Sequence, residues 1–580
     1  MAQRDETMTR SSSVTEEAEP RPAGAGALPE PSPPTAVTGR RRFRYTLPGA
    51  WVALAFACLA FTPSLLPRSA LLQGVVCGIS AAIGYGVWVA GAWTWRAFAD
   101  RDPRPPRPGT WRAFAISAAV LLIVALVLGQ WWQAQLRDLM GAPTPNLLLL
   151  VLLPLAAVAL FTGLVALSRS LRGLYRRVAG RLRRWMGPRA AGALGWVAVV
   201  VVTWLVVSGL LLNGLAALAD RGFSVRNTAT AEGVEQPTST LRSGGPGSLV
   251  SWESLGRQGQ TITGTGPSAA EIAAFTGSSA KAPIRAYAGT VSAEDVEARA
   301  ELAAADLERA GGFDRGYLLV ATTTGSGWLD SGATDSFEYL TGGDSAIVAM
   351  QYSYLPSWLS YLVDQKKARE AGRELFDAVY DRWSKLPPAH RPRLFVFGLS
   401  LGSFGGETAF SGEYDLRNRT AGALFAGPPN FNTLYREFTD DRDPGSDEVE
   451  PVYKDGRTVR FTNDVAAGVA PTSTRWDGTR VLYLQHPSDP IVWWSPRLIW
   501  DRPDWLGQPH GRDVLDAMFW IPLVTFWQVT ADLPLSTGVP DGHGHNYHRE
   551  FVDGWAKVLQ PAGWTTDKAE QLRDIISTTE

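Results

Sequence analysis

The sequence is poor in cysteine and carries almost no net charge. Only two cysteines, Cys58 and Cys77, occur among 580 residues, and both lie inside apolar runs. Neither a disulfide framework nor a cysteine-based zinc site is therefore available to the C-terminal part of the chain. Lysine and arginine (55) nearly balance aspartate and glutamate (56), for a formal net charge of -1. A protein that neutralises nucleic-acid phosphates would be strongly basic, so we expect no nucleic-acid partner.

The first residues lack large apolar side chains. Residues 1–38 mix Ser, Glu, Ala and Pro, as in PEPRPAGAGALPEPSPP. Such a stretch cannot bury enough surface to offset the entropy lost on ordering. We therefore expect a disordered tail over residues 1–45, which ends in a cluster of four arginines.

Long apolar runs dominate residues 46–219 and predict a helical transmembrane domain. A helix needs about 20 apolar residues to cross ~30 Å of hydrocarbon. Five runs approach or exceed this length: Leu47–Leu66, Leu71–Trp93, Trp111–Trp132, Leu147–Leu167 and Ala190–Leu218. The sequence thus predicts about five spans, with the first retained as an anchor because further apolar segments follow it.

The distribution of arginine predicts the orientation. Arginines gather before the first run, between the second and third, and between the fourth and fifth. The alternate connections are poor in charge: Thr62–Ala70 holds only Arg68, and Gln133–Asn146 balances Arg137 against Asp138. Because basic loops stay in the cytoplasm, the N-terminus should be cytoplasmic and the chain after about Asp220 should lie outside the cytoplasmic (inner) membrane. The alternative is a re-entrant first run, which would reverse the side of the C-terminal part.

The C-terminal part has the pattern of an α/β domain. Residues 220–280 are rich in Gly, Ser and Thr and are interpreted as a connector and an irregular start of the next domain, which covers residues 281–580. Helical stretches at Ala293–Ala310 and Trp358–Lys385 alternate with short apolar runs. These runs are Gly316–Thr322, Ser345–Tyr352, Arg393–Gly398, Gly422–Ala426, Val481–Gln485 and Leu523–Val529. Apolar strands separated by helices predict a mostly parallel sheet covered on both faces.

A candidate nucleophile follows the strand Arg393–Gly398. Gly398-Leu399-Ser400-Leu401-Gly402 has the form Gly-x-Ser-x-Gly in a strand–turn–helix context. The glycines suit a sharp turn that lifts a serine clear of the sheet, where neighbouring backbone leaves no room for side chains. Ser400 is the predicted nucleophile, and a purely structural turn is the alternative.

A serine hydroxyl requires a histidine base and an acid that orients it. Asp489 follows the strand Val481–Gln485, where catalytic acids of such sheets lie, and Glu407 and Asp344 are weaker candidates. The segment from Asp541 to His548 supplies the base, either His545 or His543. A metal site formed by His543, His545 and His548 is the competing interpretation, although no acidic motif accompanies it.

The remaining parts of the expected site are two oxyanion donors and a substrate wall. One donor is the amide of Leu401, and the other comes from the loop Thr322–Trp328. That loop could instead cradle a phosphate, but no Gly-Lys-Ser/Thr ending follows it. Aromatic residues such as Trp493 and Trp494 between the acid and the base form either core or an acyl-binding wall. This chemistry requires no cofactor and no metal.

Several longer stretches resemble one family. FTPSLLPR in the membrane region, and PIRAYAG, QYSYLPSWLSYLVD, GLSLGS and DGHGHNY beyond it, are similar to the bacterial α/β-hydrolase family that has a dedicated N-terminal membrane domain. The resemblance covers about residues 45–575. It implies an α/β-hydrolase fold, a serine-hydrolase site at Ser400 and a histidine from the GHGH segment.

Together these features predict a membrane-embedded serine hydrolase that cleaves an ester of a lipid or cell-envelope component. An acyltransferase that uses the same three residues is one alternative. A non-catalytic scaffold or transport accessory, in which the α/β domain only binds a partner, is the other; few ionisable residues within the apolar runs mark a transport path.

Overall fold

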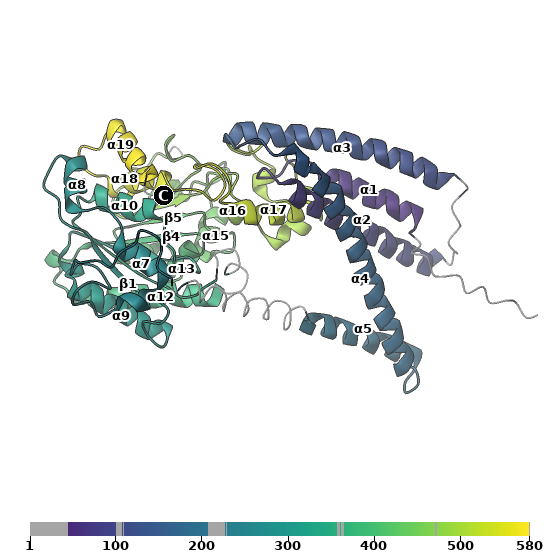
Figure 1. The fold of residues 1–580 in the computed structure, drawn as a ribbon, viewed down its shortest axis with the longest axis horizontal. Helices are drawn as coiled ribbons and strands as arrows, with labels where there is room; N and C mark the ends of the chain where they lie inside the picture. Colours follow the sequence, from purple (N-terminus) through teal and green to yellow (C-terminus); the bar gives the residue numbers. More distant parts are fainter. Residues whose placement is uncertain are drawn as a thin grey trace, which may run out of the picture. The chain divides into compact units, whose positions relative to one another are not determined.

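The computed structural model describes residues 45–99, 107, 109–206, 227, 229–355, 360, 365–469 and 472–578. The predicted tail, residues 1–45, thus lies outside the described residues except for Tyr45. Residues from Leu47 to Glu580 form one compact unit, which contains both the N-terminal helices and the C-terminal sheet (Figure 1).

The N-terminal region is helical but has fewer candidate membrane spans than the sequence predicts. Its elements are α1 (Leu47–Leu59), α2 (Ala70–Ala99), α3 (Thr110–Met140), η1 (Leu147–Val151), α4 (Leu152–Leu182) and α5 (Pro188–Trp204). Among the described residues, three helical stretches are long and apolar enough to cross a membrane, namely Ala70–Ala99, Thr110–Met140 and Leu148–Leu182. The prediction of about five spans is therefore wrong.

The first apolar run forms a shorter helix than expected. The helix of the first run ends at Leu59, and the prolines at positions 63 and 67 beyond it cannot donate the bonds that would continue a helix. Its 13 residues rise only about 20 Å. The last run forms α5, which is 17 residues long. The remainder of that run, residues 207–218, lies outside the described residues.

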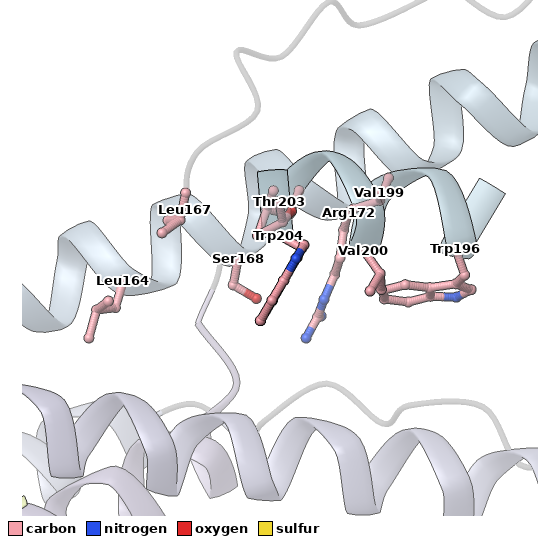
Figure 2. A pocket seen from close by; sticks show the side chains of 10 residues that line it. Leu164, Leu167, Ser168, Arg172, Trp196, Val199, Val200, Thr203 and Trp204 are labelled. Atoms are coloured by element: carbon pink, nitrogen blue, oxygen red, sulfur yellow. The ribbon is translucent and has the colours of Figure 1, made fainter. Parts of the chain in front are cut away.

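A groove of about 620 Å³ lies between α4 and α5. Its walls are apolar apart from Ser168, Arg172 and Thr203. Figure 2 shows the side chains of Arg172, Trp196 and Trp204 extending into the same space. All residues that line this groove belong to α4 and α5, so it is separate from the site described below.

The C-terminal region is built on a seven-stranded sheet of order β1-β3-β2-β4-β5-β7-β6. The strands are β1 (Ile284–Ala288), β2 (Tyr317–Thr322), β3 (Ser345–Met350), β4 (Arg393–Leu399), β5 (Gly422–Ala426), β6 (Val459–Thr462) and β7 (Arg480–Leu484). All of these strand pairs are parallel. The predicted α/β architecture with a mostly parallel sheet is confirmed.

Helices cover both faces of the sheet. In chain order the longer ones are α7 (Gly256–Gly264), α8 (Ala269–Thr276), α9 (Val296–Arg309), α10 (Ser331–Leu340), α12 (Gln365–Lys385), α13 (Leu401–Glu407), α14 (Glu413–Arg419), α15 (Thr433–Asp440), α17 (Thr525–Asp532), α18 (Glu550–Leu559) and α19 (Thr566–Ser577). Leu318 of β2 packs in one apolar cluster with α9 and α12 residues. Its neighbour Leu319 packs in another, with Phe337 of α10 and Trp555 of α18. This double coverage explains the near-continuous apolar character of the strands.

Five of the six predicted strands are confirmed as β2, β3, β4, β5 and β7, and the sixth is wrong. Leu523–Val529 falls largely in the helix α17, which packs against α2. The sequence also missed β1 and β6. Arg285 interrupts the apolar pattern of β1, yet it is buried because it pairs with Asp335 and Glu338, and β6 has only four residues.

Candidate active site

Ser400 lies at a sharp turn between β4 and α13. Its φ of 56° and ψ of -125° define a backbone conformation that residues with a side chain rarely adopt. A Cβ on Gly398 would collide with the backbone of Gly402, and a Cβ on Gly402 would collide with the carbonyl oxygen of Thr322. The Gly-x-Ser-x-Gly pattern is thus a steric requirement of this turn, and it presents Ser400 at the carboxyl end of a central strand.

Asp489 lies beyond the end of β7 and holds His545. Its Oδ1 accepts the backbone N–H of Ile491 at 2.9 Å, which caps the short helix α16 (Pro490–Trp493). Its Oδ2 lies 2.6 Å from Nδ1 of His545 and accepts the Tyr547 hydroxyl at 2.8 Å. Because a carboxylate only accepts, Nδ1 of His545 carries a proton, so Nε2 is the ring nitrogen that accepts a proton when the imidazole is neutral.

Gly427 and Tyr547 shape the surroundings of this pair. Gly427 follows β5 with a φ of +50°, and a Cβ there would collide with the His545 ring and crowd Oδ2 of Asp489. The Tyr547 ring stacks on His486, with ring centroids 4.0 Å apart, and lies edge-on to His545. Burial and the neighbouring Asp489 charge raise the pKa of Tyr547 well above its ordinary value. Its hydroxyl therefore remains a hydrogen-bond donor to Asp489.

Ser400 and His545 line the same cavity, which has a volume of about 940 Å³. His545 is only 8% exposed, and its Nε2 has no hydrogen-bond partner among the described residues. That nitrogen is the atom that takes a proton in a serine–histidine–aspartate site. The structure brings three of the predicted residues, Ser400, Asp489 and His545, to one site.

The cavity has apolar and acidic walls. The apolar side chains include Ile262, Leu329, Leu399, Ile491, Leu533 and Ile575. Its three acidic residues all have partners: Asp330 bonds His548, Asp335 pairs with Arg285, and Glu271 accepts the backbone N–H of Ser268. That backbone bond, with the Ser268 hydroxyl, holds the pKa of Glu271 below its ordinary value.

The other histidines near the site each have a different polar partner. His543 lies 3.0 Å from Asp513 through Nδ1 and does not line the cavity. His548 bonds Asp330 at 2.6 Å. Across the described ranges, no three His, Cys, Asp or Glu side chains come together as a metal site requires. The geometry therefore favours His545 over His543 as the base.

His486 braces the segment that carries the base. Its Nδ1 faces the carbonyl oxygen of Gly544 at 2.8 Å, and its Nε2 faces Glu550 at 2.6 Å. Burial opposes a charge on this ring, but the Glu550 carboxylate outweighs burial and raises the pKa of His486 to about 9. Both ring nitrogens thus face acceptors, as a doubly protonated imidazole requires.

The two alternative acids, Glu407 and Asp344, are engaged elsewhere. Glu407, at the end of α13, accepts bonds from Asn432, from the Tyr483 hydroxyl and from two backbone amides. Its complete burial raises its pKa to about 7. Asp344 pairs with Lys281 at 2.8 Å. None of these bonds involves a candidate histidine.

The two predicted oxyanion donors lie beside the nucleophile. Leu401 is the first residue of α13, so its amide has no acceptor within the helix. In the Thr322–Trp328 loop, Thr324 and Trp328 line the cavity. The Thr324 amide, however, donates to the Trp328 carbonyl at 3.0 Å and so closes the loop.

The sequence left the aromatic residues between the acid and the base as either core or an acyl-binding wall. Trp493 is 1% exposed, and its indole N–H donates to the His486 carbonyl at 3.0 Å, so it belongs to the core rather than to an acyl-binding wall. The cavity wall includes Gln258 and Thr261 of α7, and Leu533, Pro534, Ser536 and Thr537 after α17. The first of these segments lies in the predicted connector, where high Gly, Ser and Thr content hid a helix.

Comparison with known proteins agrees with the α/β fold of the C-terminal region. Residues 284–572 match the alpha/beta-hydrolase family, and residues 61–267 match the alpha/beta-hydrolase family N-terminus. The chain belongs to this α/β-hydrolase family. In this α/β-hydrolase the first match contains the complete sheet and Ser400, Asp489 and His545, and the second contains α2 to α5. No curated protein and no solved structure matches the chain.

Proposed function

We propose that this α/β-hydrolase is a membrane-bound serine hydrolase that cleaves an ester of a lipid or cell-envelope component. One observation carries the proposal: His545 is held by Asp489 through Nδ1, its Nε2 has no hydrogen-bond partner among the described residues, and its side chain lines the same cavity as Ser400. A strained serine, a buried histidine and a buried carboxylate that orients the histidine are the parts of an acyl-enzyme mechanism.

In the proposed mechanism Ser400 attacks the ester carbonyl while Nε2 of His545 takes its proton. Asp489 stabilises the imidazolium that forms, and the Leu401 amide donates to the oxyanion together with an amide of the Thr322–Trp328 loop other than that of Thr324. His545 then protonates the leaving alcohol. Water, activated by the same histidine, releases the acid from Ser400. No step requires a cofactor.

The size and lining of the cavity support an ester with an apolar portion. A volume of about 940 Å³ is at the upper end of the range of ~300–1,000 Å³ that small-molecule sites occupy. If an alcohol replaces water in the last step, the same residues catalyse acyl transfer. Comparison of the lipids in cells with and without the gene, including acylglycerols, aminoacylated phospholipids and acylated envelope sugars, identifies the ester that accumulates.

Labelling with a fluorophosphonate probe tests the proposal directly. The folded wild-type protein should react at one serine, and Ser400→Ala should not react. Ser403→Ala is the matched control, because Ser403 lies one turn away on α13 and its hydroxyl donates to the Ser400 carbonyl. Folded wild-type protein that stays unlabelled would favour the scaffold alternative.

We further propose that the catalytic region lies on the outer side of the cytoplasmic membrane. The loop between α1 and α2 contacts the catalytic region through Arg68 and Asp532, so both must lie on one side of the membrane. Crossings by α2, α3 and α4 leave the chain on the opposite side. Return to the first side then requires a fourth crossing, which we assign to the shorter apolar helix α5.

Cysteine accessibility tests this topology. In a background without Cys58 and Cys77, Tyr414→Cys places a thiol at an exposed position of the catalytic region, and Trp185→Cys places one between α4 and α5. An impermeant maleimide should label the first in sealed right-side-out vesicles and the second only after permeabilisation. The reverse pattern contradicts the proposed orientation.

A further inference from the structure

The loop between α1 and α2 is buried against the catalytic region. Leu65 and Leu66 are fully buried in an apolar cluster that also contains Leu401 and Ile491. Gln528 of α17 donates to the carbonyl and the hydroxyl of Thr62 at 3.0 and 3.1 Å, across 466 positions of sequence. Part of the core around the active site is therefore supplied by the membrane region.

Asp532, the last residue of α17, collects the polar contacts of this loop. Arg68 Nε donates to Oδ1 of Asp532 at 2.7 Å, and both side chains are fully buried. Oδ2 of Asp532 accepts the Ser64 hydroxyl and the Leu65 amide. Removal of one partner from such a pair leaves an uncompensated buried charge, so the pair resists displacement.

Arg68 is itself fixed by the membrane region. Its backbone N–H donates to the Gln133 side chain at 2.8 Å, and its carbonyl accepts from Arg137 at 3.0 Å. Gln133 and Arg137 belong to the last turns of α3. The position of Asp532 is thus set by α3 and by the loop that follows α1.

The active-site wall begins directly after Asp532. Leu533, Pro534, Ser536 and Thr537 line the cavity together with Ser400 and His545. The Ser536 carbonyl accepts the backbone N–H of His545 at 2.7 Å. A continuous set of contacts therefore connects Arg68, through Asp532 and Ser536, to the candidate base.

We propose that Arg68 and Ser64 are positioning residues of the active site. Through Asp532 they fix the wall formed by residues 533–537 and the backbone of His545, so the membrane region determines the geometry of the base. This inference rests on the proposed hydrolase function. It predicts that turnover depends on a loop between two helices of the membrane region, outside the α/β fold.

Arg68→Met in the full-length protein, purified in detergent, tests the inference. Its kcat for a p-nitrophenyl ester, per folded molecule, should fall at least tenfold, and the rate of fluorophosphonate labelling at Ser400 should fall similarly. Arg68→Lys, which keeps a charge beside Asp532, should recover kcat to within about threefold of wild type. A merely structural role would lower the melting temperature and leave kcat of the folded protein unchanged.

The control is Arg436→Met, which removes an ion pair with Glu448 at 3.1 Å; neither residue lines the cavity. It should lower the melting temperature and leave kcat within twofold of wild type. Folded Arg68→Met with kcat within twofold of wild type overturns the positioning role, whereas wild-type protein that the probe does not label overturns the hydrolase function itself.

If Arg68→Met does not fold, Ser64→Ala tests the same inference. A three- to tenfold loss of kcat is expected, and an unchanged kcat overturns the inference.

Discussion

Replacement of Gly427 by alanine should lower catalytic activity by displacing His545, beyond the loss of stability that backbone strain alone causes. Gly427 has a φ of +50°, and the added Cβ would collide with the His545 ring and crowd the carboxylate of Asp489. The left-handed backbone alone costs about 1–2 kcal/mol of stability. The collision must in addition move the ring, because the backbone of β5 is fixed by parallel pairing with β4 and β7.

The matched control for this strain is Gly445→Ala. Gly445 has a φ of +90°, and a Cβ there has nothing within 4 Å. Gly445→Ala should lose ~1–2 kcal/mol of stability, and Gly427→Ala should lose at least as much, measured by thermal unfolding. Displacement of a catalytic group by about 1 Å can cost about 100-fold in rate, so kcat/KM for a p-nitrophenyl ester should fall at least 100-fold in Gly427→Ala only. Equal kcat/KM values in the two variants would refute the assignment of the His545–Asp489 pair.

Three further predictions concern the residues around this pair. His545→Gln should abolish ester hydrolysis. His543→Gln should keep kcat within about tenfold of wild type, because His543 bonds Asp513 outside the cavity. The reverse result would make His543 the base. The pKa of His486 is raised to about 9, so its contribution of about 3 kcal/mol is fully present below pH ~6.5 and is lost as the pH rises through about 9. The melting temperature of wild type should therefore fall over that range, and His486→Gln should lack this component. The pKa of Glu407 is raised to about 7, so ionisation of this buried group should lower the stability of the protein as the pH rises from ~4.5 to about 7. Glu407→Gln should lack that decline. If the melting temperatures of wild type and Glu407→Gln depend on pH in the same way, Glu407 is not the titrating group.

The sequence sufficed for those parts of the fold in which local pattern and tertiary environment agree. The strands β2 to β5 and β7 are apolar because both sheet faces are covered. A continuous apolar run can be recognised in the sequence without knowledge of the residues that pack against it. The sharp turn at Ser400 could be predicted for a similar reason. Its steric requirement for Gly398 and Gly402 falls within five consecutive residues.

Features that depend on distant partners could not be predicted. The apolar run at Leu523–Val529 has the composition of a strand, but it forms a helix that packs on α2. Arg285 interrupts the apolar pattern of β1, and the strand was missed because the partners that allow its burial, Asp335 and Glu338, lie about 50 positions away in the sequence. The choice between His543 and His545 likewise depends on which carboxylate each one meets, and Asp513 and Asp489 are indistinguishable as residue types.

The buried contacts of Arg68 and Arg137 also sharpen the proposed membrane orientation. These are the arginines of the two charge-poor connections, Thr62–Ala70 and Gln133–Asn146. Both are buried, Arg68 against Asp532 and Arg137 against backbone carbonyls of Gln133 and Arg68. An arginine engaged within the protein adds no free positive charge to its loop. In the folded protein these connections therefore expose no arginine, whereas the connection after α4 exposes several. The count of arginines, which sets orientation, differs in the same direction. Because Arg68 joins the charge-poor connection to the active-site wall, the wall takes the side of that connection, which the arginine distribution predicts to be the outer side.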